Sequence, residues 1–382
     1  MPEKKIGLGL IGCGFGSQSL YGSFFKYLEN GELVGVTDID EQRAQQCAEM
    51  SGARKIYRDY REMVADPEVD AVLILTPPFA HLEPVAAAAK VGKHVYCEKP
   101  MAKTVSEAQA MIDICRQNGV KLQTAFMKRA NLSFLKVKSL LDEGVIGQVF
   151  SMRAIWDNCR STLDAKHGYR LNAISGGGFL QEDGSHPLDV IHWWLGEVEE
   201  VSGYVQIIDP QRWDSEDTAV VSMKHKNGCI STLHITLLTQ RTGMESYEVF
   251  GTGGTLLMQW PYHSTKTLEP AIIRVFKGSD TVKDYTLYTS WNPQVELESS
   301  WQYLRELRSF CNCILIDTEP EVTGEDGRVV VEIINAAYIS ADENRKVALP
   351  LDKDPDFDKI FGRLRAQSRF HIKDEEACWS RY

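Results

Sequence analysis

Residues 9–20, GLIGCGFGSQSL, place three glycines between a short apolar run and a segment with helical periodicity. Gly12, Gly14 and Gly16 permit a tight turn, and they let backbone N–H groups approach a pyrophosphate at the start of the following helix. Ser17 stands at the last small position of this motif, where Gly or Ala is usual. The stretch predicts the first strand, turn and helix of a dinucleotide-binding sheet.

The next strand-like run, ELVGVTD at 32–38, ends in an acid. A carboxylate at Asp38 accepts hydrogen bonds from a ribose diol and repels a 2′-phosphate, so the sequence favours NAD over NADP. The competing interpretation is that Asp38 caps the helix that begins near Glu41. Because strand, glycines, helix and acid follow in the order of a dinucleotide site, we favour the cofactor role. We expect Phe15 and Ile39 beside the same cofactor.

Strand-like and helix-like segments alternate through the first 125 residues. Runs rich in β-branched residues lie at 6–12, 32–38, 55–59, 70–76, 94–98 and 121–126. Such alternation implies a parallel sheet with right-handed crossovers. We therefore predict an NAD-binding Rossmann domain, which is a doubly wound α/β domain, over residues 1–125. Its ligand should lie beyond the carboxyl ends of the strands, where the sequence places Thr76, Pro77, His81, Glu98 and Lys99.

Longer alternating runs follow a helical segment at 133–144. KNG at 226–228 puts Asn-Gly between two of these runs, which is a strong signal of a β-hairpin. Helical periodicity returns later in the chain. We therefore predict an α+β domain with a large open-faced, mainly antiparallel sheet over residues 126–351, and a C-terminal extension over 352–382.

Composition narrows the classes of partner. The chain has 382 residues, of which 25% are charged and 43% hydrophobic, as in soluble globular proteins. Its net charge of −11 opposes binding to nucleic acid or to an anionic membrane, and no apolar run approaches the roughly 20 residues of a membrane span. Nine cysteines without a CxxC pair, and an N-terminus without an export signal, indicate a cytoplasmic protein with reduced thiols. A small molecule is the expected partner.

A second motif, GGGFLQEDGSHPLDVIHWWLG, spans residues 176–196. Glu182 and Asp183 precede His186 by four and three residues, spacings that bring side chains to one face of a helix. The unperturbed pKa of histidine is about 6.5, which suits proton exchange near neutral pH. His186 with a neighbouring acid is therefore a candidate acid/base pair. The competing interpretation is a helix start with acids placed for the macrodipole, which Pro187 supports but which leaves His186 unexplained. A third ligand at metal spacing is missing, so we predict no metal.

The chain resembles the Gfo/Idh/MocA family of NAD(P)-dependent oxidoreductases in GLIGCGFGS, Asp38, GKHVYCEKPMAKTVSEA (92–108) and GGGFLQEDGSHPLD (176–189). The likeness continues through 247–258 and 319–351 and leaves 352–382 outside. It implies that the second domain binds substrate and joins subunits into homodimers or homotetramers. The implied reaction is hydride transfer between the nicotinamide and a carbinol carbon of a sugar, sugar derivative or cyclitol.

The resemblance also implies roles for individual residues. The lysine of the EKP segment, Lys99, is expected near the nicotinamide and the reacting oxygen, where it stabilises negative charge or relays the proton. His186 carries over as the acid/base. The family's acid stands four residues before this histidine and is usually Asp, but here the position holds Glu182. Asp183 follows it, and we expect its oxygens to cap the next helix, with a smaller catalytic contribution.

Substrate recognition is harder to read from the sequence. WDNCRSTLDAKHGYRLN at 156–172 is rich in cations, and two more stand where the chain enters the second domain. These charges are either solvated surface or a group that holds a carboxylate, phosphate or sulfonate on a sugar. The candidates are Lys128, Arg129, Trp156, Arg160, His167, Tyr169 and Arg170.

Two other functions stay open at this point. Some relatives keep NAD bound and oxidise the sugar transiently, so that a glycosidic bond is eliminated without net redox change. The replacement of Asp by Glu182 slightly favours this glycosidase or lyase reaction. A non-catalytic NAD-binding protein is the third hypothesis, against which Lys99 and His186 argue.

Overall fold

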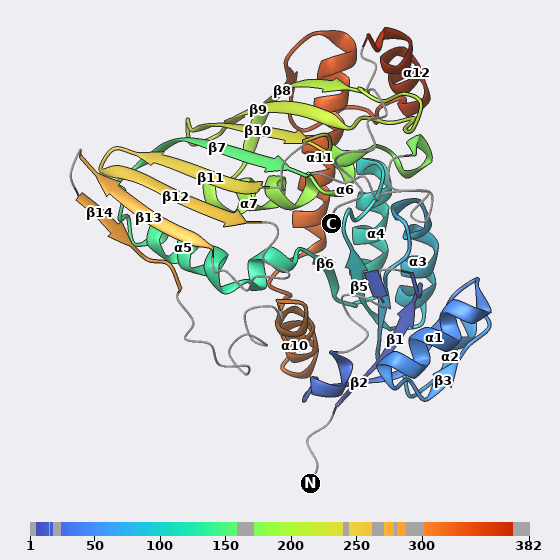
Figure 1. The fold of residues 1–382 in the computed structure, drawn as a ribbon. Helices are drawn as coiled ribbons and strands as arrows, with labels where there is room; N and C mark the ends of the chain where they lie inside the picture. The colour runs from blue at the N-terminus through green and yellow to red at the C-terminus, as the bar shows by residue number, and fades with distance from the viewer. Residues whose placement is uncertain are drawn as a thin grey trace, which may run out of the picture. The chain divides into compact units, whose positions relative to one another are not determined.

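The structure is a computed structural model that describes residues 5–14, 16–17, 24–158, 172–239, 244–261, 271–278, 281–287 and 302–369 (Figure 1). The chain forms two compact units. Of the described residues, the first unit holds those up to Asn131 and those from Gln302 to Val329. The second unit holds the described residues from Leu132 to Leu287 and from Val330 onward.

The first unit contains a parallel sheet of six strands in the order β3-β2-β1-β4-β5-β6. The strands are β1 Ile6–Ile11, β2 Gly31–Thr37, β3 Lys55–Ile56, β4 Ala71–Ile74, β5 His94–Glu98 and β6 Leu122–Ala125. Every residue of β1 and β4 is buried, as expected for central strands of a sheet that helices cover on both faces. The predicted doubly wound parallel sheet is confirmed.

Helices connect these strands, as the predicted alternation of strands and helices requires. They are α1 Glu41–Ser51, α2 Tyr60–Ala65, α3 Leu82–Lys90 and α4 Val105–Gln117. Local capping explains where they begin: Asp40 caps α1, and Thr104 with Glu107 forms a capping box on α4. Most of the segment with helical periodicity that follows the glycine-rich turn lies outside the described residues, and a short 3₁₀ turn, η2, follows at Phe25–Tyr27.

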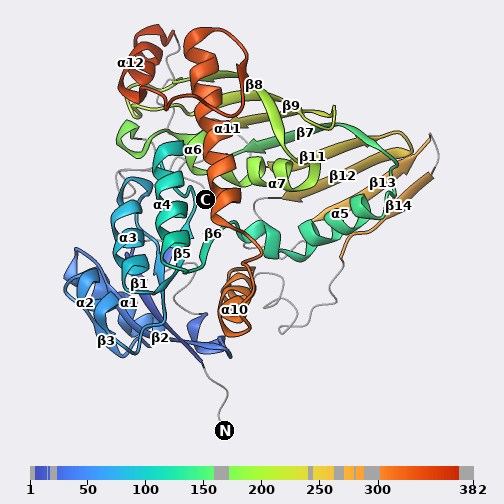
Figure 2. The ribbon, with the colours of Figure 1, turned by 180° about the vertical axis from the view of Figure 1, so that it is seen from behind.

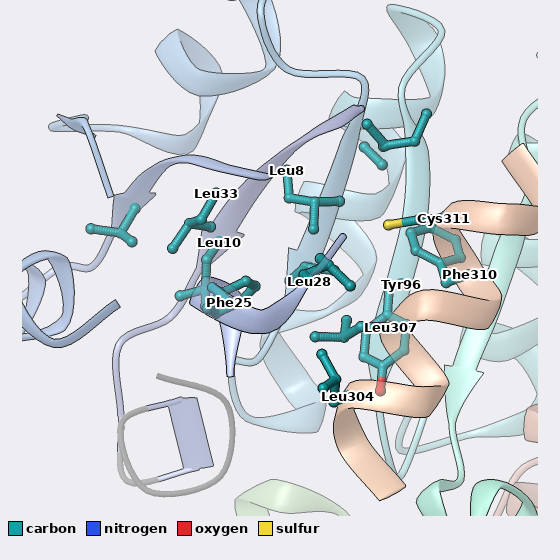
Figure 3. Packing of buried hydrophobic residues seen from close by; sticks show 14 of the residues in the cluster. Leu8, Leu10, Phe25, Leu28, Leu33, Tyr96, Leu304, Leu307, Phe310 and Cys311 are labelled. Carbon is teal, nitrogen blue, oxygen red and sulfur yellow. The ribbon is translucent and has the colours of Figure 1, made fainter. Parts of the chain in front are cut away.

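A distant helix completes the core of the first unit. Helix α10, Gln302–Leu315, brings Leu304, Leu307 and Phe310 against the side chains of β1 and β2. Figure 3 shows these residues packed with Leu8, Leu10, Phe25, Leu28, Leu33 and Tyr96. Cys311 and Cys313, the CNC pair of the sequence, are buried in this helix and are not bridged.

The second unit contains a sheet of nine strands in the order β14-β13-β12-β11-β7-β10-β9-β8-β15. The strands are β7 Val149–Asp157, β8 Val198–Gln206, β9 Thr218–His225, β10 Ile230–Thr236, β11 Met244–Gly251, β12 Gly254–Pro261, β13 Ile272–Lys277, β14 Thr281–Asp284 and β15 Val347–Ala348. Neighbouring strands are antiparallel except β7 and β10, which are parallel. The predicted mainly antiparallel sheet is confirmed, and Asn227-Gly228 does connect the hairpin of β9 and β10.

One face of this sheet carries helices, and no described helix covers the other, which we call the open face (Figures 1 and 2). Helices α5, Leu132–Asp142, and α7, Ser185–Leu195, lie along the same face in Figures 1 and 2. Every second side chain of the strands points away from these helices, toward the open face. Tyr204 and Val220 are a cross-strand pair on that open face, and they are 73% and 38% exposed.

The start of the predicted C-terminal extension folds as a helix. Helix α12, Phe357–Gln367, places Phe357 and Phe361 edge-on against Tyr338 of α11, Gly324–Glu343, with ring centroids 6.0 and 5.4 Å apart. Among the described residues, no helix has the length and apolar character that crossing a membrane requires.

Candidate functional site

The glycine-rich turn after β1 has the backbone geometry that the sequence predicts. Gly12 has a φ of 96°, and an added Cβ would lie 2.9 Å from Thr76 Cγ2. At Gly14 and Gly16, an added Cβ would meet nothing within 4 Å. The Ser17 hydroxyl donates a hydrogen bond to the carbonyl of Gly12, which gives this unusual serine a role in holding the turn. Phe15 lies outside the described residues.

Asp38 follows the last residue of β2 and faces this turn. Its Oδ2 accepts a hydrogen bond from the backbone N–H of Cys13 at 2.6 Å, and its Oδ1 accepts one from Asp40 at 2.8 Å. A carboxylate has about four acceptor sites, so both oxygens retain capacity for a diol. The cap of α1 is Asp40, not Asp38, so the competing interpretation of Asp38 as that cap is wrong. Ile39 is fully exposed.

His81 joins the loops that follow β4 and β5. Its side chain is completely buried, with Nε2 2.7 Å from the carbonyl oxygen of Thr76 and Nδ1 2.9 Å from that of Met101. The adjoining Pro77 lies on the first of these loops. The histidine therefore fixes the loops to each other, whatever it contributes to cofactor binding.

Glu98 and Lys99 stand at the carboxyl end of β5. Glu98 is the last residue of the strand, and its Oε2 accepts the backbone N–H of Lys99 at 2.6 Å. The peptide bond between Lys99 and Pro100 is cis, and the lysine is half-buried. In a parallel sheet, carboxyl ends share one edge. The predicted residues Gly12, Asp38, Thr76 and Lys99 therefore lie along the same edge of the first sheet.

The two cations near the end of the first unit lie in a 3₁₀ turn, η4 Met127–Ala130. Arg129 forms an ion pair with Asp326, with 3.0 Å between Nη2 and Oδ1. Burial acts to raise the pKa of Asp326, but the Arg129 cation and hydrogen bonds from Thr323 outweigh it and hold the pKa below its usual value. Arg129 thus has a structural partner, while Lys128 is almost completely buried.

The second motif forms two helices rather than one. Helix α6, Phe179–Glu182, ends at the candidate acid, and α7 begins at Ser185. Asp183 is the C-terminal cap of α6, and Gly184 precedes α7 without any side-chain cap. The expectation that Asp183 caps the second helix is wrong, because the helix break falls on Asp183 itself. Asp183 and Gly184 both keep right-handed helical backbone angles, so the argument that spacing brings these side chains to one face stays a prediction.

The turn between these helices nevertheless gathers the predicted residues in a buried place. Glu182, Asp183 and His186 are 7%, 4% and 7% exposed, and the N–H of His186 donates to the carbonyl of Asp183 at 3.1 Å. The His186 ring stacks on Trp156 of β7, with centroids 5.7 Å apart and an angle of 8° between planes. Trp156, a predicted substrate residue, therefore lies against the candidate acid/base.

Sequence reasoning missed the residue that holds this turn. Glu216, which precedes β9, is completely buried, and its carboxylate accepts the backbone N–H groups of Gly178 and Leu180. Burial raises the pKa of Glu216 to about 7, although hydrogen bonds from Tyr338 and these backbone groups act to lower it. The local signal was a run of acids, DSED at 214–217, before an alternating strand. Such a run by itself is typical of solvated loops.

The remaining substrate candidates lie outside the described residues. They are Arg160, His167, Tyr169 and Arg170.

Comparison with known proteins identifies both parts of the chain. Residues 6–126 match the model described as the oxidoreductase family, NAD-binding Rossmann fold, and residues 134–257 match that of the GFO/IDH/MocA C-terminal domain. The chain is 30% identical over 350 residues to the myo-inositol 2-dehydrogenase of Thermotoga maritima, covering 90% of this chain and 97% of that protein. It is 27% identical to the D-apiose dehydrogenase of Paraburkholderia graminis, covering 91% and 90%.

Solved structures agree with these sequence relatives. The chain is similar to the WlbA dehydrogenase of Bordetella pertussis, a structure in complex with NADH and UDP-GlcNAcA. The TM-score is 0.77 at 25% identity, and the alignment covers 92% of this chain and all of the other.

Proposed function

Because the chain belongs to the Gfo/Idh/MocA family of oxidoreductases, we propose that it is an NAD-dependent dehydrogenase acting on CH–OH groups. Its substrate is a sugar, a sugar derivative or a cyclitol, because its relatives include a myo-inositol 2-dehydrogenase and a D-apiose dehydrogenase. The observation that carries the proposal is the buried turn that presents Glu182 and Asp183 beside His186. Such a group suits proton transfer at a hydroxyl.

The residues of the first unit fit a dinucleotide. The turn at Gly12 is closed to any side chain, whereas Gly14 and Gly16 leave open space for a ligand to approach the backbone. Asp38 supplies acceptors for a ribose diol and a charge that repels a 2′-phosphate, so NAD is the preferred cofactor. When bound, NAD supplies the acceptor or donor of the hydride.

The chain's own residues manage the proton and the charge. Loss of a hydride from a carbinol leaves an alkoxide unless the hydroxyl proton departs as well. His186 takes that proton, and Glu182 orients its imidazole and supports its positive charge. Lys99 stabilises the negative charge that develops on the oxygen. An acidic group on the substrate would interact with cations at Lys128 or in the 156–172 segment, which stays a prediction.

We expect subunits to associate through the open face of the second sheet. Tyr204, Val220 and Ile230 expose large apolar side chains there, at 73%, 38% and 57%. Apolar groups gathered on one face are typical of an interface. A homodimer or homotetramer in sedimentation analysis supports this expectation, and a monomer at micromolar concentration contradicts it.

The function is tested by supplying NAD with a panel of sugars, acidic sugars, cyclitols and glycosides. The assay follows both the absorbance of NADH and the release of aglycone. NADH formed in proportion to consumed substrate supports the dehydrogenase. Aglycone without net NADH indicates the redox-neutral glycosidase instead, and neither product across the whole panel contradicts both enzymes.

A further inference from the structure

The N-terminus of α6 is held by a residue far away in the sequence. Glu216 Oε2 accepts the N–H of Gly178 at 2.7 Å, and Oε1 accepts the N–H of Leu180 at 2.8 Å. The backbone carbonyl of Glu216 accepts the N–H of Phe179 at 2.8 Å. Three successive donors at the start of the helix are therefore satisfied by one residue.

Helix α6 needs such external support. It spans only Phe179–Glu182, and its N-cap, Gly178, has no side chain to cap it. A helix of one turn is unstable alone, because nucleation fixes several backbone angles for a single hydrogen bond. The first N–H groups of a helix also have no partner within it. The position of the turn therefore depends on Glu216.

Tyr338 fixes the carboxylate in turn. Its hydroxyl donates to Glu216 Oε1 at 2.8 Å, and both side chains are completely buried. On its other side, the Tyr338 ring meets Phe357 and Phe361 of α12. The helix at the start of the C-terminal extension thus supports the residue that orients Glu216.

Two glycines of the GGG run match this pair closely. A Cβ added at Gly178 would lie 1.9 Å from the carbonyl oxygen of Glu216, and one added at Gly177 would lie 2.2 Å from the hydroxyl oxygen of Tyr338. Neither position accepts a side chain while the pair stays in place. The absence of a side chain at these two glycines therefore allows Glu216 and Tyr338 to pack directly against the backbone.

The support extends through hydrogen bonds to the candidate catalytic residues. Glu182 is the last residue of α6, and the N–H of Asp183 donates to the carbonyl of Phe179 at 3.0 Å. The carbonyl of Asp183 then accepts the N–H of His186. A displacement at the start of α6 is therefore passed on to all three side chains.

We infer that Glu216 and Tyr338 are positioning residues that fix the α6–α7 turn for catalysis. The inference rests on the proposed function. Two carboxylate oxygens accept from three donors here, namely the N–H groups of Gly178 and Leu180 and the Tyr338 hydroxyl. An amide has one acceptor oxygen, and its NH₂ group would face another donor. A glutamine at position 216 therefore cannot hold the turn in the same way.

The test compares Glu216→Gln with Asp217→Asn. Asp217 is a matched control because it is equally buried and also binds two backbone N–H groups, those of Ile208 and Asp209, which lie outside the turn. We expect Glu216→Gln to lower kcat by about 10- to 100-fold, since displacements of about 1 Å have such effects. Dinucleotide affinity should stay unchanged, and Asp217→Asn should retain kcat within about threefold. Tyr338→Phe, which keeps the ring but removes the donor, should lower kcat by less than Glu216→Gln.

Hydrogen exchange provides a readout that does not need activity. We expect amides of residues 176–186 to exchange faster in Glu216→Gln than in the unmodified protein, and to be unaffected in Asp217→Asn. Unchanged exchange in Glu216→Gln, or an equal increase in both variants, overturns the inference. An unmodified protein that never turns over contradicts the proposed function alone, because the exchange comparison still tests the positioning.

Discussion

The imidazole of His186 lies parallel to the indole of Trp156, with 5.7 Å between ring centroids and 8° between planes. The two rings come from different elements, α7 and β7, so the stack sets the plane of the histidine relative to the sheet. Offset stacks of aromatic rings stabilise by about 0.5–1.5 kcal/mol beyond the area they bury. Trp156 is therefore expected to orient the acid/base.

Trp156→Leu should lower kcat by about tenfold, because an aliphatic side chain does not hold the plane of the imidazole. Trp156→Phe preserves a stacked ring and should lose less. Kinetics on the preferred substrate separate two roles. A change confined to KM would mean that the tryptophan contacts substrate and does not orient His186.

Lys99→Ala should remove most turnover while NAD affinity stays close to that of the unmodified protein. The reason is that a cation placed at a developing negative charge contributes mainly in the transition state, and its loss costs about a hundredfold or more in rate. Lys103→Ala, which removes a half-buried lysine further along the same loop, is a suitable control. If Lys99→Ala keeps most of its kcat, the lysine takes no part in the reaction.

Glu182 and Asp183 should differ in importance. Glu182→Gln is expected to lower kcat strongly with little change in Tm, because the amide cannot support a protonated His186. Asp183→Asn should do less damage, since this residue supports the turn through its own backbone N–H and carbonyl groups. Turnover and melting temperature of both variants decide the matter. An inactive Asp183→Asn beside a normal Glu182→Gln would reverse the assignment.

Cofactor preference should depend on Asp38. We expect NAD to bind much more tightly than NADP, and Asp38→Ser to narrow that difference by removing the charge that repels the 2′-phosphate. Asp40→Ser is the matched control: it removes a carboxylate two residues away, keeps a good cap on α1, and should change neither stability nor cofactor preference appreciably. Equal affinities of the unmodified protein for NAD and NADP would refute the assignment.

The parts of the fold that sequence predicts best are those with local causes. Alternating apolar runs and the glycines after β1 predict the parallel sheet, because a turn and a strand are specified within a few residues. The packing of α10 against β1 and β2 has no such local signal, because the apolar face of a helix does not specify which sheet it packs against. The same holds for Glu216, which binds Gly178 across 38 positions in the sequence. The helix break at Asp183 was not predicted, because the argument from residue spacing assumes one continuous helix.

The stability of the protein should carry a pH dependence that comes from Glu216. Burial, as the largest cause, raises the pKa of this carboxyl from 4.5 to about 7 in the folded protein. Between these two pH values the unfolded chain has released a proton that the folded protein still binds. The free energy of unfolding therefore falls as the pH rises through this window.

Glu216→Gln removes this contribution, since an amide does not titrate. The free energy of unfolding of the unmodified protein falls between pH 4.5 and pH 8, and that of the variant lacks this fall. The difference between the two should therefore shift in favour of the variant by up to about 3 kcal/mol over this range, even though the variant loses turnover. Asp217→Asn is the control. Burial also raises the pKa of Asp217, from 3.8 to about 6. The stability difference between Asp217→Asn and the unmodified protein should therefore stop changing near pH 6. The difference for Glu216→Gln should continue to change above pH 6. Urea denaturation of the three proteins at several pH values measures these differences. A stability difference between Glu216→Gln and the unmodified protein that stays constant from pH 4.5 to pH 8 would show that Glu216 is already ionised in the folded state at low pH.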